Sequence, residues 1–305
     1  MEESVEAVGL SSISKSYGDF TAVSNLSLSI PKGIIFGLLG PNGAGKTTTI
    51  RMIVRITVPD EGAVTIFSQQ LTPKMQERIG YLPEERGLYK KMKVREQLLF
   101  LAGLKSVSAQ EADKKIKYWT ERLEISNWLE KKTDELSKGM QQKIQFISTI
   151  LHSPELLILD EPFSGLDPIN ANLLIEVIQE LKKSGCTIIL STHVMEQVEK
   201  LCDEICIINR SQKVLDGNLK TIKREFGNNR IALAVEGDSS FLRNSPFVEN
   251  WTEFLHHIEL DLCEGVDSQQ LLRQVIDSGV RVTRFELVEP SLNEIFIKKV
   301  GKSNE

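Results

Sequence analysis

The 305-residue chain has an ordinary composition for a folded protein, with 41% hydrophobic residues, 26% charged residues, 10 Pro and 20 Gly. These values exclude a fibrous or disordered chain, and the length allows one large domain and a smaller one. Because the formal net charge is -5, the protein has no broad positive field, and no nucleic acid partner is expected.

The N-terminus and the apolar runs of the chain bear on its location. The first ten residues, MEESVEAVGL, are acidic and lack the basic start and apolar run of a secretory signal. The apolar runs at residues 34–39 and 156–159 are far shorter than the roughly 18 residues of a membrane-spanning helix. We therefore expect a cytoplasmic protein that meets a membrane only peripherally.

Up to about residue 220, short apolar runs rich in β-branched residues alternate with stretches of helical periodicity, which is typical of an α/β domain. The first strands are predicted to be antiparallel. Leu26, Leu28 and Ile30 alternate with polar residues, as in a half-buried strand. The fully apolar run at residues 34–39 then predicts a buried strand.

The eight residues after this buried strand fit the pattern GxxxxGK[ST] of a phosphate-binding loop, and a helix is predicted over residues 48–54. Glycines let backbone N–H groups approach phosphate oxygens, Lys46 would reach the β- and γ-phosphates, and the Thr47 hydroxyl can ligate Mg²⁺. The sequence thus predicts a site for ATP and Mg²⁺. The predicted nucleotide-binding residues are Gly40, Pro41, Asn42, Gly43, Ala44, Gly45, Lys46, Thr47 and Thr48.

The sequence between residues 93 and 130 changes to amphipathic helical periodicity, within a helical subdomain expected at about 88–150. Ser108 is followed three residues later by Glu111. This spacing is that of a capping box and predicts that a helix begins there.

A second apolar strand, residues 156–159, ends in the adjacent carboxylates Asp160 and Glu161. A phosphate loop alone would also suit a kinase or a GTPase, and hydrolysis requires a further Mg²⁺ ligand and a general base. Asp160 is predicted to ligate Mg²⁺ and Glu161 to activate water. The alternative is a pair of exposed turn acids before Pro162. We expect this strand to lie next to the strand at residues 34–39.

The sequence after about residue 225 has the pattern of a separate α+β domain, residues 226–305, which we interpret as an accessory module for interaction or regulation. It shows no internal repeat and no dense cluster of reactive residues. Its expected strands are residues 231–235, 258–262 and 280–285, and its expected helices are residues 269–276 and 291–300.

Three further motifs follow the phosphate loop. Residues 136–142 read LSKGMQQ, residues 164–167 read SGLD and residues 191–193 read STH. They resemble the LSGGQ signature, the D-loop and the switch histidine of ABC-type ATPases, and Tyr17 matches the aromatic residue that stacks on adenine. Over residues 7–220 the sequence is therefore similar to nucleotide-binding subunits of ABC transporters.

The resemblance implies an α/β fold over residues 1–225, a P-loop NTPase of the ABC cassette type. Its mixed sheet core would carry an antiparallel β subdomain and a helical subdomain. His193 would act in catalysis together with Lys46 and Glu161. Taken singly, His193 would be a structural histidine and Tyr17 a packing residue, and only the ordered set of motifs favours the functional interpretation.

The resemblance also implies a second nucleotide-binding subunit, either an identical copy or a paralogue. Two subunits would enclose two ATP molecules head to tail, and Ser137 and Gly139 of one would complete the phosphate site of the other. A γ-phosphate would then meet the positive end of a helix dipole. Taken alone, Ser137 would be only a helix cap.

The sequence departs from the family at two places. Glu84 follows Pro83 where the family usually has a glutamine that contacts Mg²⁺ and water, although some exporter subunits also read PEERGLY. A carboxylate can still ligate Mg²⁺, but it adds negative charge beside Glu161 and the γ-phosphate. In the signature, Lys138 and Met140 replace the usual Gly and Gln.

A basic cluster lies just after Glu84, with Leu88, Tyr89 and Met92 interleaved. In the family this region faces the membrane subunit, and a mixed apolar and basic patch suits docking near an anionic leaflet. The alternative is an ordinary solvated surface. The cluster consists of Arg86, Lys90, Lys91, Lys93 and Arg95.

These features predict the ATP-hydrolysing motor subunit of an ABC-2 type exporter, in the branch of sodium and drug efflux. The membrane permease of this exporter would be another chain. One alternative is a soluble ABC protein acting on ribosomes or DNA, which would need two cassettes or a long coiled coil. The other is a regulatory subunit without turnover, which would lack a base or a switch histidine.

Overall fold

The computed structural model describes residues 5–70, 72–85, 87–227, 230–263 and 265–301. The chain forms two compact units, residues 1–219 and 220–305, and each is described by itself. In the described parts of the chain, no helix has both the length and the apolar character needed to cross a bilayer.

The first unit contains a four-stranded sheet in the order β2-β1-β4-β5. Neighbouring strands pair antiparallel, and the expected strand with Leu26, Leu28 and Ile30 lies within β2. The strands are β1 (Glu6–Tyr17), β2 (Phe20–Pro31), β4 (Glu61–Ile66) and β5 (Gln69–Gln70).

The second sheet of this unit has six strands in the order β10-β9-β3-β8-β7-β6. All its pairs are parallel except β9 with β10. One expectation is wrong, because β8 lies between β3 and β7 and the two strands are not neighbours. The strands are β3 (Ile35–Leu39), β6 (Ile79–Leu82), β7 (Leu156–Asp160), β8 (Thr187–Thr192), β9 (Glu204–Asn209) and β10 (Gln212–Asn218).

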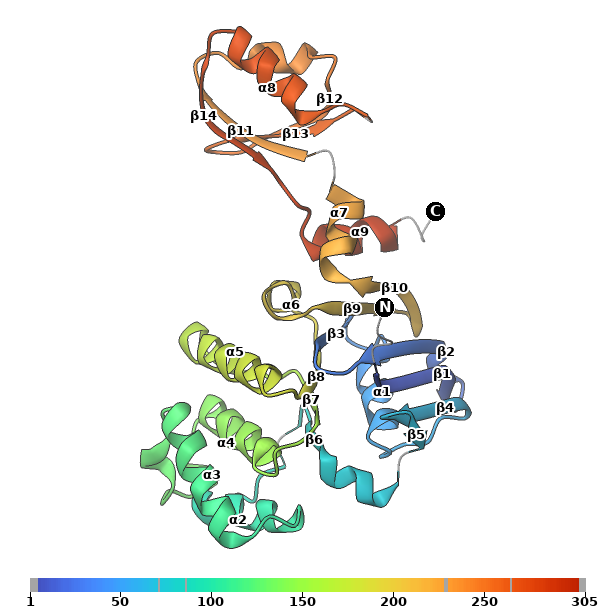
Figure 1. The fold of residues 1–305 in the computed structure, drawn as a ribbon, viewed down its shortest axis with the longest axis vertical. Coiled ribbons are helices and arrows are strands. Elements are labelled where there is room, and N and C mark those ends of the chain that lie inside the picture. The colour runs from blue at the N-terminus through green and yellow to red at the C-terminus, as the bar shows by residue number, and fades with distance from the viewer. Residues whose placement is uncertain (1–4, 71, 86, 228–229, 264, 302–305) are drawn as a thin grey trace. The chain divides into compact units, whose positions relative to one another are not determined.

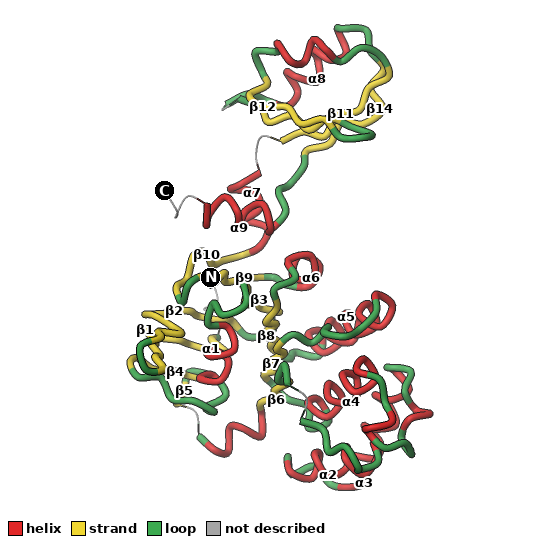
Figure 2. Tube along the Cα trace, turned by 180° about the vertical axis from the view of Figure 1, so that it is seen from behind, coloured by secondary structure: helices red, strands yellow, loops and turns green. Residues whose placement is uncertain are grey.

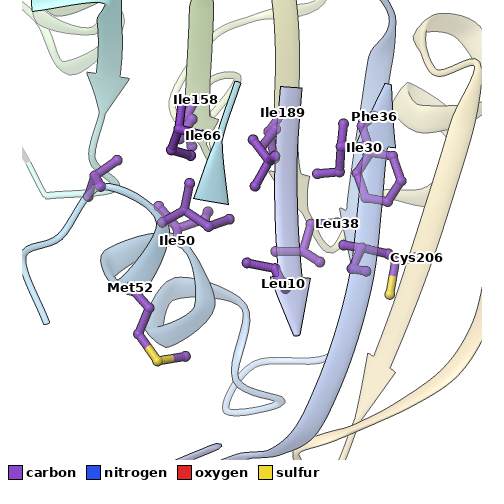
Figure 3. Close-up of a cluster of buried hydrophobic side chains, with 14 of the residues drawn as sticks. Leu10, Ile30, Phe36, Leu38, Ile50, Met52, Ile66, Ile158, Ile189 and Cys206 are labelled. Atoms are coloured by element: carbon purple, nitrogen blue, oxygen red, sulfur yellow. The ribbon is translucent and has the colours of Figure 1, made fainter. Parts of the chain in front are cut away.

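Helix α1 (Lys46–Ile53) lies between the two sheets, as Figure 2 shows. Its apolar residues Ile50 and Met52 join buried side chains from both sheets in one core, among them Leu10 and Leu38 (Figure 3). Burial at roughly 25 cal/mol per Å² of apolar surface makes this core the main stabilising feature around the phosphate loop. The core therefore fixes where α1 begins.

The helical subdomain lies beside β6, which forms the edge of the six-stranded sheet (Figure 1). Ser108 caps α3 as expected, since its Oγ accepts a hydrogen bond of 3.3 Å from Glu111 N, while the Glu111 carboxylate pairs with Lys115. The helices here are α2 (Val94–Leu104), α3 (Ala109–Arg122) and α4 (Lys138–Ile150). Helices α5 (Pro168–Lys183) and α6 (Met195–Leu201) follow β7 and β8.

The second unit contains a four-stranded antiparallel sheet in the order β12-β13-β11-β14, with α8 packed against it. The strands are β11 (Arg230–Glu236), β12 (Val248–Glu253), β13 (Ile258–Leu262) and β14 (Arg281–Leu287), and the helices are α7 (Leu219–Gly227), α8 (Ser268–Asp277) and α9 (Leu292–Gly301). The sequence did not predict β12, because this edge strand is mostly exposed and polar and has no apolar alternation.

Candidate functional site

The phosphate loop connects β3 to α1, and two of its glycines are required by close backbone contacts. Gly40 and Gly45 both have positive φ angles, 150° and 110°. A Cβ atom would lie 2.1 Å from Ile208 O at Gly40 and 2.3 Å from Ala22 O at Gly45. Because both obstacles are backbone atoms, only glycine fits, and the chain can turn directly into the start of α1.

The Lys46 ammonium is the buried cation of this loop. Its side chain folds back so that Nζ donates to Gly40 O at 2.8 Å and to Pro41 O at 3.1 Å. Burial lowers the Lys46 pKa, and the nearby carboxylates of Glu161, Asp160 and Glu84 oppose this shift. A positive charge held by backbone carbonyls at a helix start is suited to bind phosphate.

The side chains of Thr47 and Asp160 meet at the N-terminus of α1. The Thr47 Oγ1 donates a hydrogen bond of 3.0 Å to Asp160 Oδ2. Asp160 is almost fully buried at the end of β7, and burial raises its pKa, while the hydrogen bond from Thr47 opposes the rise. A hydroxyl and a carboxylate that converge in this way fit Mg²⁺, which prefers hard oxygen ligands and takes the rest from substrate phosphates.

Glu161 is held by the end of β8. Its φ angle of 49° is unusual for a residue other than glycine, and its backbone N donates to Ser191 O at 2.9 Å. The carboxylate accepts hydrogen bonds of 3.1 Å from Thr192 Oγ1 and from His193 N, and His193 Nδ1 lies 2.7 Å from Oε1. The position of β8 beside β7 therefore supplies the partners that orient this carboxylate.

These residues surround one cavity of about 380 Å³. The structure thus brings together the loop, both carboxylates, the histidine and Glu84, from four separate segments of the chain. The lining consists of Phe20, Ala22, Asn42, Gly43, Gly45, Lys46, Thr47, Thr48, Glu84, Asp160, Glu161 and His193.

The cavity lining differs from the predicted set at its aromatic edge. Tyr17 is 49% exposed and lies outside the described lining, whereas Phe20, 58% exposed, is part of it. The two residues are paired across the β1–β2 turn. The only signal in the sequence for Phe20 was an aromatic residue near Gly18, and Tyr17 gives the same signal.

Ser137 and Gly139 lie at the start of α4, outside the described cavity lining. The Ser137 Oγ accepts a hydrogen bond of 3.3 Å from Met140 N and so caps the helix. A Cβ at Gly139 would come within 2.8 Å of Gly165 O in the loop after Glu161. Within a single chain, the signature segment therefore packs against its own D-loop.

Comparison with known proteins places the chain among relatives of one kind. The family described as ABC transporter matches residues 23–164, and the C-terminal domain of DrrA1-3-like ATP-binding proteins matches residues 217–300. An uncharacterized ABC transporter ATP-binding protein of Bacillus subtilis, YhaQ, is 48% identical over 289 residues, which cover 95% of this chain and 97% of that protein. The chain belongs to the ABC transporter ATP-binding proteins.

Two further comparisons extend this assignment. The Nod factor export ATP-binding protein I of Rhizobium meliloti is 32% identical and covers 97% of this chain and 88% of its own. A solved structure titled as the ATP binding subunit of an ABC transporter is 30% identical, with a TM-score of 0.68, covering 72% of this chain and 93% of its own. This ABC transporter ATP-binding protein is accordingly an ATPase that powers transport.

Proposed function

We propose that this ATPase drives export by a separate ABC-2 type permease, from the cytoplasmic face of the cell membrane. The match of residues 217–300 to the DrrA1-3-like C-terminal domain and the similarity to a Nod factor export protein support export. Residues 1–225 would form the motor domain and residues 226–305 an accessory domain. The observation that carries the proposal is the single cavity that gathers Lys46, Asp160, Glu161 and His193.

In the proposed mechanism, the loop amides and Lys46 bind the phosphates of ATP. Glu161 acts as the general base toward the attacking water, and Thr192 and His193 hold its carboxylate in place. Thr47, Asp160 and Glu84 would hold Mg²⁺, which neutralises phosphate charge when it is bound. Tyr17, at the exposed β1–β2 turn, would stack on adenine.

The proposed active form contains a second nucleotide-binding subunit, identical or paralogous. Ser137 and Gly139 lie outside the cavity lining formed by the described residues, yet they begin a helix whose N-terminus can receive an anion. In a head-to-tail dimer, they would meet the γ-phosphate bound by the other subunit. ATP would then hold the dimer together, and hydrolysis would release it.

The permease is proposed to dock on the segment around Tyr89. Lys93 pairs with Glu130 at 2.9 Å and Arg95 pairs with Asp113, so these two cations also serve the helical subdomain. Lys90 and Lys91 are exposed. Arg86 lies outside the described residues. Tyr89 packs edge-on against Phe100 and both rings are partly exposed, which provides an apolar centre with a basic rim.

Purification from native membranes tests the proposal. The tagged chain, extracted with mild detergent, should recover a polytopic membrane protein in a fixed ratio, and the pair in vesicles should hydrolyse ATP faster than the chain alone. Lys46→Ala should keep the membrane partner and lose hydrolysis. Recovery of ribosomes, of DNA or of no membrane protein would contradict the proposed export function.

A further inference from the structure

The buried face of α4 carries two glutamines that hold loops on either side of the nucleotide cavity. Gln142 Nε2 donates to Pro162 O at 3.0 Å, directly after Glu161. Gln145 Nε2 donates to Glu85 O at 3.2 Å and to Pro83 O at 3.4 Å. Because residues three apart share one face of a helix, a single rigid element holds both loops.

Gln145 holds the loop immediately on either side of Glu84. Its two acceptors are the carbonyls of the residues before and after Glu84, so that one NH₂ group spans the segment from which the carboxylate projects. Glu84 lines the cavity with Asp160 and Glu161. Since the contacts involve backbone only, the Gln145 amide constrains the backbone at Glu84 and leaves the carboxylate free to face the cavity.

The Gln145 amide at this position has a desolvation cost that packing alone does not explain. Gln145 is buried, and its Oε1 has no hydrogen-bond partner among the described residues. A buried carbonyl oxygen without a partner costs its full desolvation, and a methionine of similar length would avoid that cost. The amide therefore has a reason other than stability at this position.

We propose that Gln145 is a positioning residue that aims the Glu84 carboxylate at the divalent cation of the nucleotide site. The inference rests on the cation-binding role proposed for Glu84. Residues that orient a metal ligand affect metal affinity on the order of 10-fold or more. By linkage, the factor by which Mg²⁺ tightens nucleotide binding equals the factor by which nucleotide tightens Mg²⁺ binding, so either can be measured.

The test measures the affinity for a fluorescent, non-hydrolysable ATP analogue with Mg²⁺ and with a chelator. In Gln145→Met the tightening by Mg²⁺ should fall roughly 10-fold relative to the parent, with little change in affinity in the chelator. Gln145→Asn keeps the amide one methylene shorter and should shift in the same direction. If Gln145→Met does not fold, Gln145→Asn is measured in its place.

Gln97→Met is the matched control. Gln97 is also a buried glutamine, its Nε2 has no hydrogen-bond partner among the described residues, and its Oε1 accepts from Tyr89 N at 2.8 Å. Gln97→Met also removes a hydrogen bond of a buried glutamine to the backbone, and it should leave the Mg²⁺ effect on nucleotide affinity unchanged. An equal loss in Gln97→Met would overturn the proposal, because it would show a general loosening of the domain.

A double-mutant cycle with Glu84→Gln separates the two levels of the argument. If Gln145 acts through Glu84, the effect of Gln145→Met should shrink in the Glu84→Gln background, where only a weaker cation ligand remains to be oriented. An undiminished Gln145→Met effect there would overturn the role of Gln145 while leaving Glu84 intact. If Glu84→Gln alone does not change the tightening by Mg²⁺, the proposed role of Glu84 fails, and the inference fails with it. The ATPase rate of the parent reports the basic activity independently.

Discussion

The N-termini of α1 and α4 lie in the same domain, and both have glycine in a motif associated with phosphate binding. They differ in their side-chain caps and in their position relative to the cavity. The start of α1 has Gly45 at its N-cap and no side-chain cap, and it opens into a cavity lined by the chain's own carboxylates. The start of α4 is capped by Ser137 and lies outside that lining. A helix start without a side-chain cap leaves its N–H groups for a ligand.

This difference separates the proposed functions of one subunit from those that need two subunits. The proposed nucleotide site takes its groups, including Lys46 and Asp160, from one chain. Ser137 and Gly139 lie outside the described lining of that cavity. If the proposed dimer is right, changes at the first helix start affect binding and chemistry within one subunit, and changes at the second affect only what two subunits do together.

The largest effect is expected at the general base. Glu161→Gln keeps the shape of the side chain but cannot take a proton, so hydrolysis should fall roughly 100-fold or more while ATP binding remains. Gel filtration with ATP should show accumulation of a dimer. Glu155→Gln, which changes a carboxylate just before the other end of β7, should hydrolyse ATP at the parent rate. Near-normal turnover in Glu161→Gln would refute the assignment.

The next effect tests the second helix start. Ser137→Asp retains a good N-cap but places a carboxylate where the γ-phosphate of the other subunit is proposed to bind, so turnover should fall roughly 30-fold or more. Thermal unfolding should change little. Ser137→Asn keeps the cap without the charge and should lose much less activity.

Ser108→Asp is the control for this change. Ser108 caps α3 with the same 3.3 Å geometry as Ser137 caps α4, and it lies outside the described lining of the nucleotide cavity. The substitution should leave turnover unchanged. If Ser137→Asp also turned over at the parent rate, the second helix start would have no part in hydrolysis, and the comparison would lose its functional meaning.

A smaller effect is expected at Glu84, where this chain departs from the usual glutamine. In Glu84→Gln the repulsion between carboxylate and phosphate is removed, and a weaker cation ligand takes its place. Hydrolysis should depend less on the Mg²⁺ concentration, and Mg²⁺ should tighten nucleotide binding roughly 10-fold less. Superimposable ATPase curves against Mg²⁺ for the variant and the parent would remove the idea.

The smallest effect concerns the stability of the empty site. Burial raises the pKa of Asp160, so the folded state holds its proton to higher pH than the unfolded chain does. This contribution favours folding at low pH and is lost as pH rises through the folded pKa. Asp160→Asn should remove that slope and raise the unfolding free energy of the nucleotide-free protein at neutral pH, measured in urea.

Asp167→Asn should change the pH dependence of stability in the opposite direction to Asp160→Asn. Hydrogen bonds from Asn170 hold the pKa of Asp167 below its usual range. Its contribution to stability is present above the unfolded pKa and is lost as pH falls through the folded pKa. The asparagine variant should therefore lose stability at neutral pH and approach the parent in acid. A parallel response of the two variants would contradict the assigned cause of the Asp160 shift.

Features that depend on neighbouring residues could be predicted from the sequence. A phosphate loop needs its glycines, Lys46 and Thr47 at fixed spacing between a strand and a helix, and that spacing is local. The cap at Ser108, the paired acids after β7 and the ordered motifs of the ABC family were predictable for the same reason. Together they were enough to predict the class of fold and the ATPase activity.

Which distant segments meet follows from the tertiary structure alone. It placed β8 between β3 and β7, which brings Thr192 and His193 to Glu161, and it brought Phe20 to the cavity. It also brought Gln145 to the two carbonyls that flank Glu84. Strand order and loop contacts depend on packing between residues far apart in the chain, so periodicity and spacing carry no signal for them.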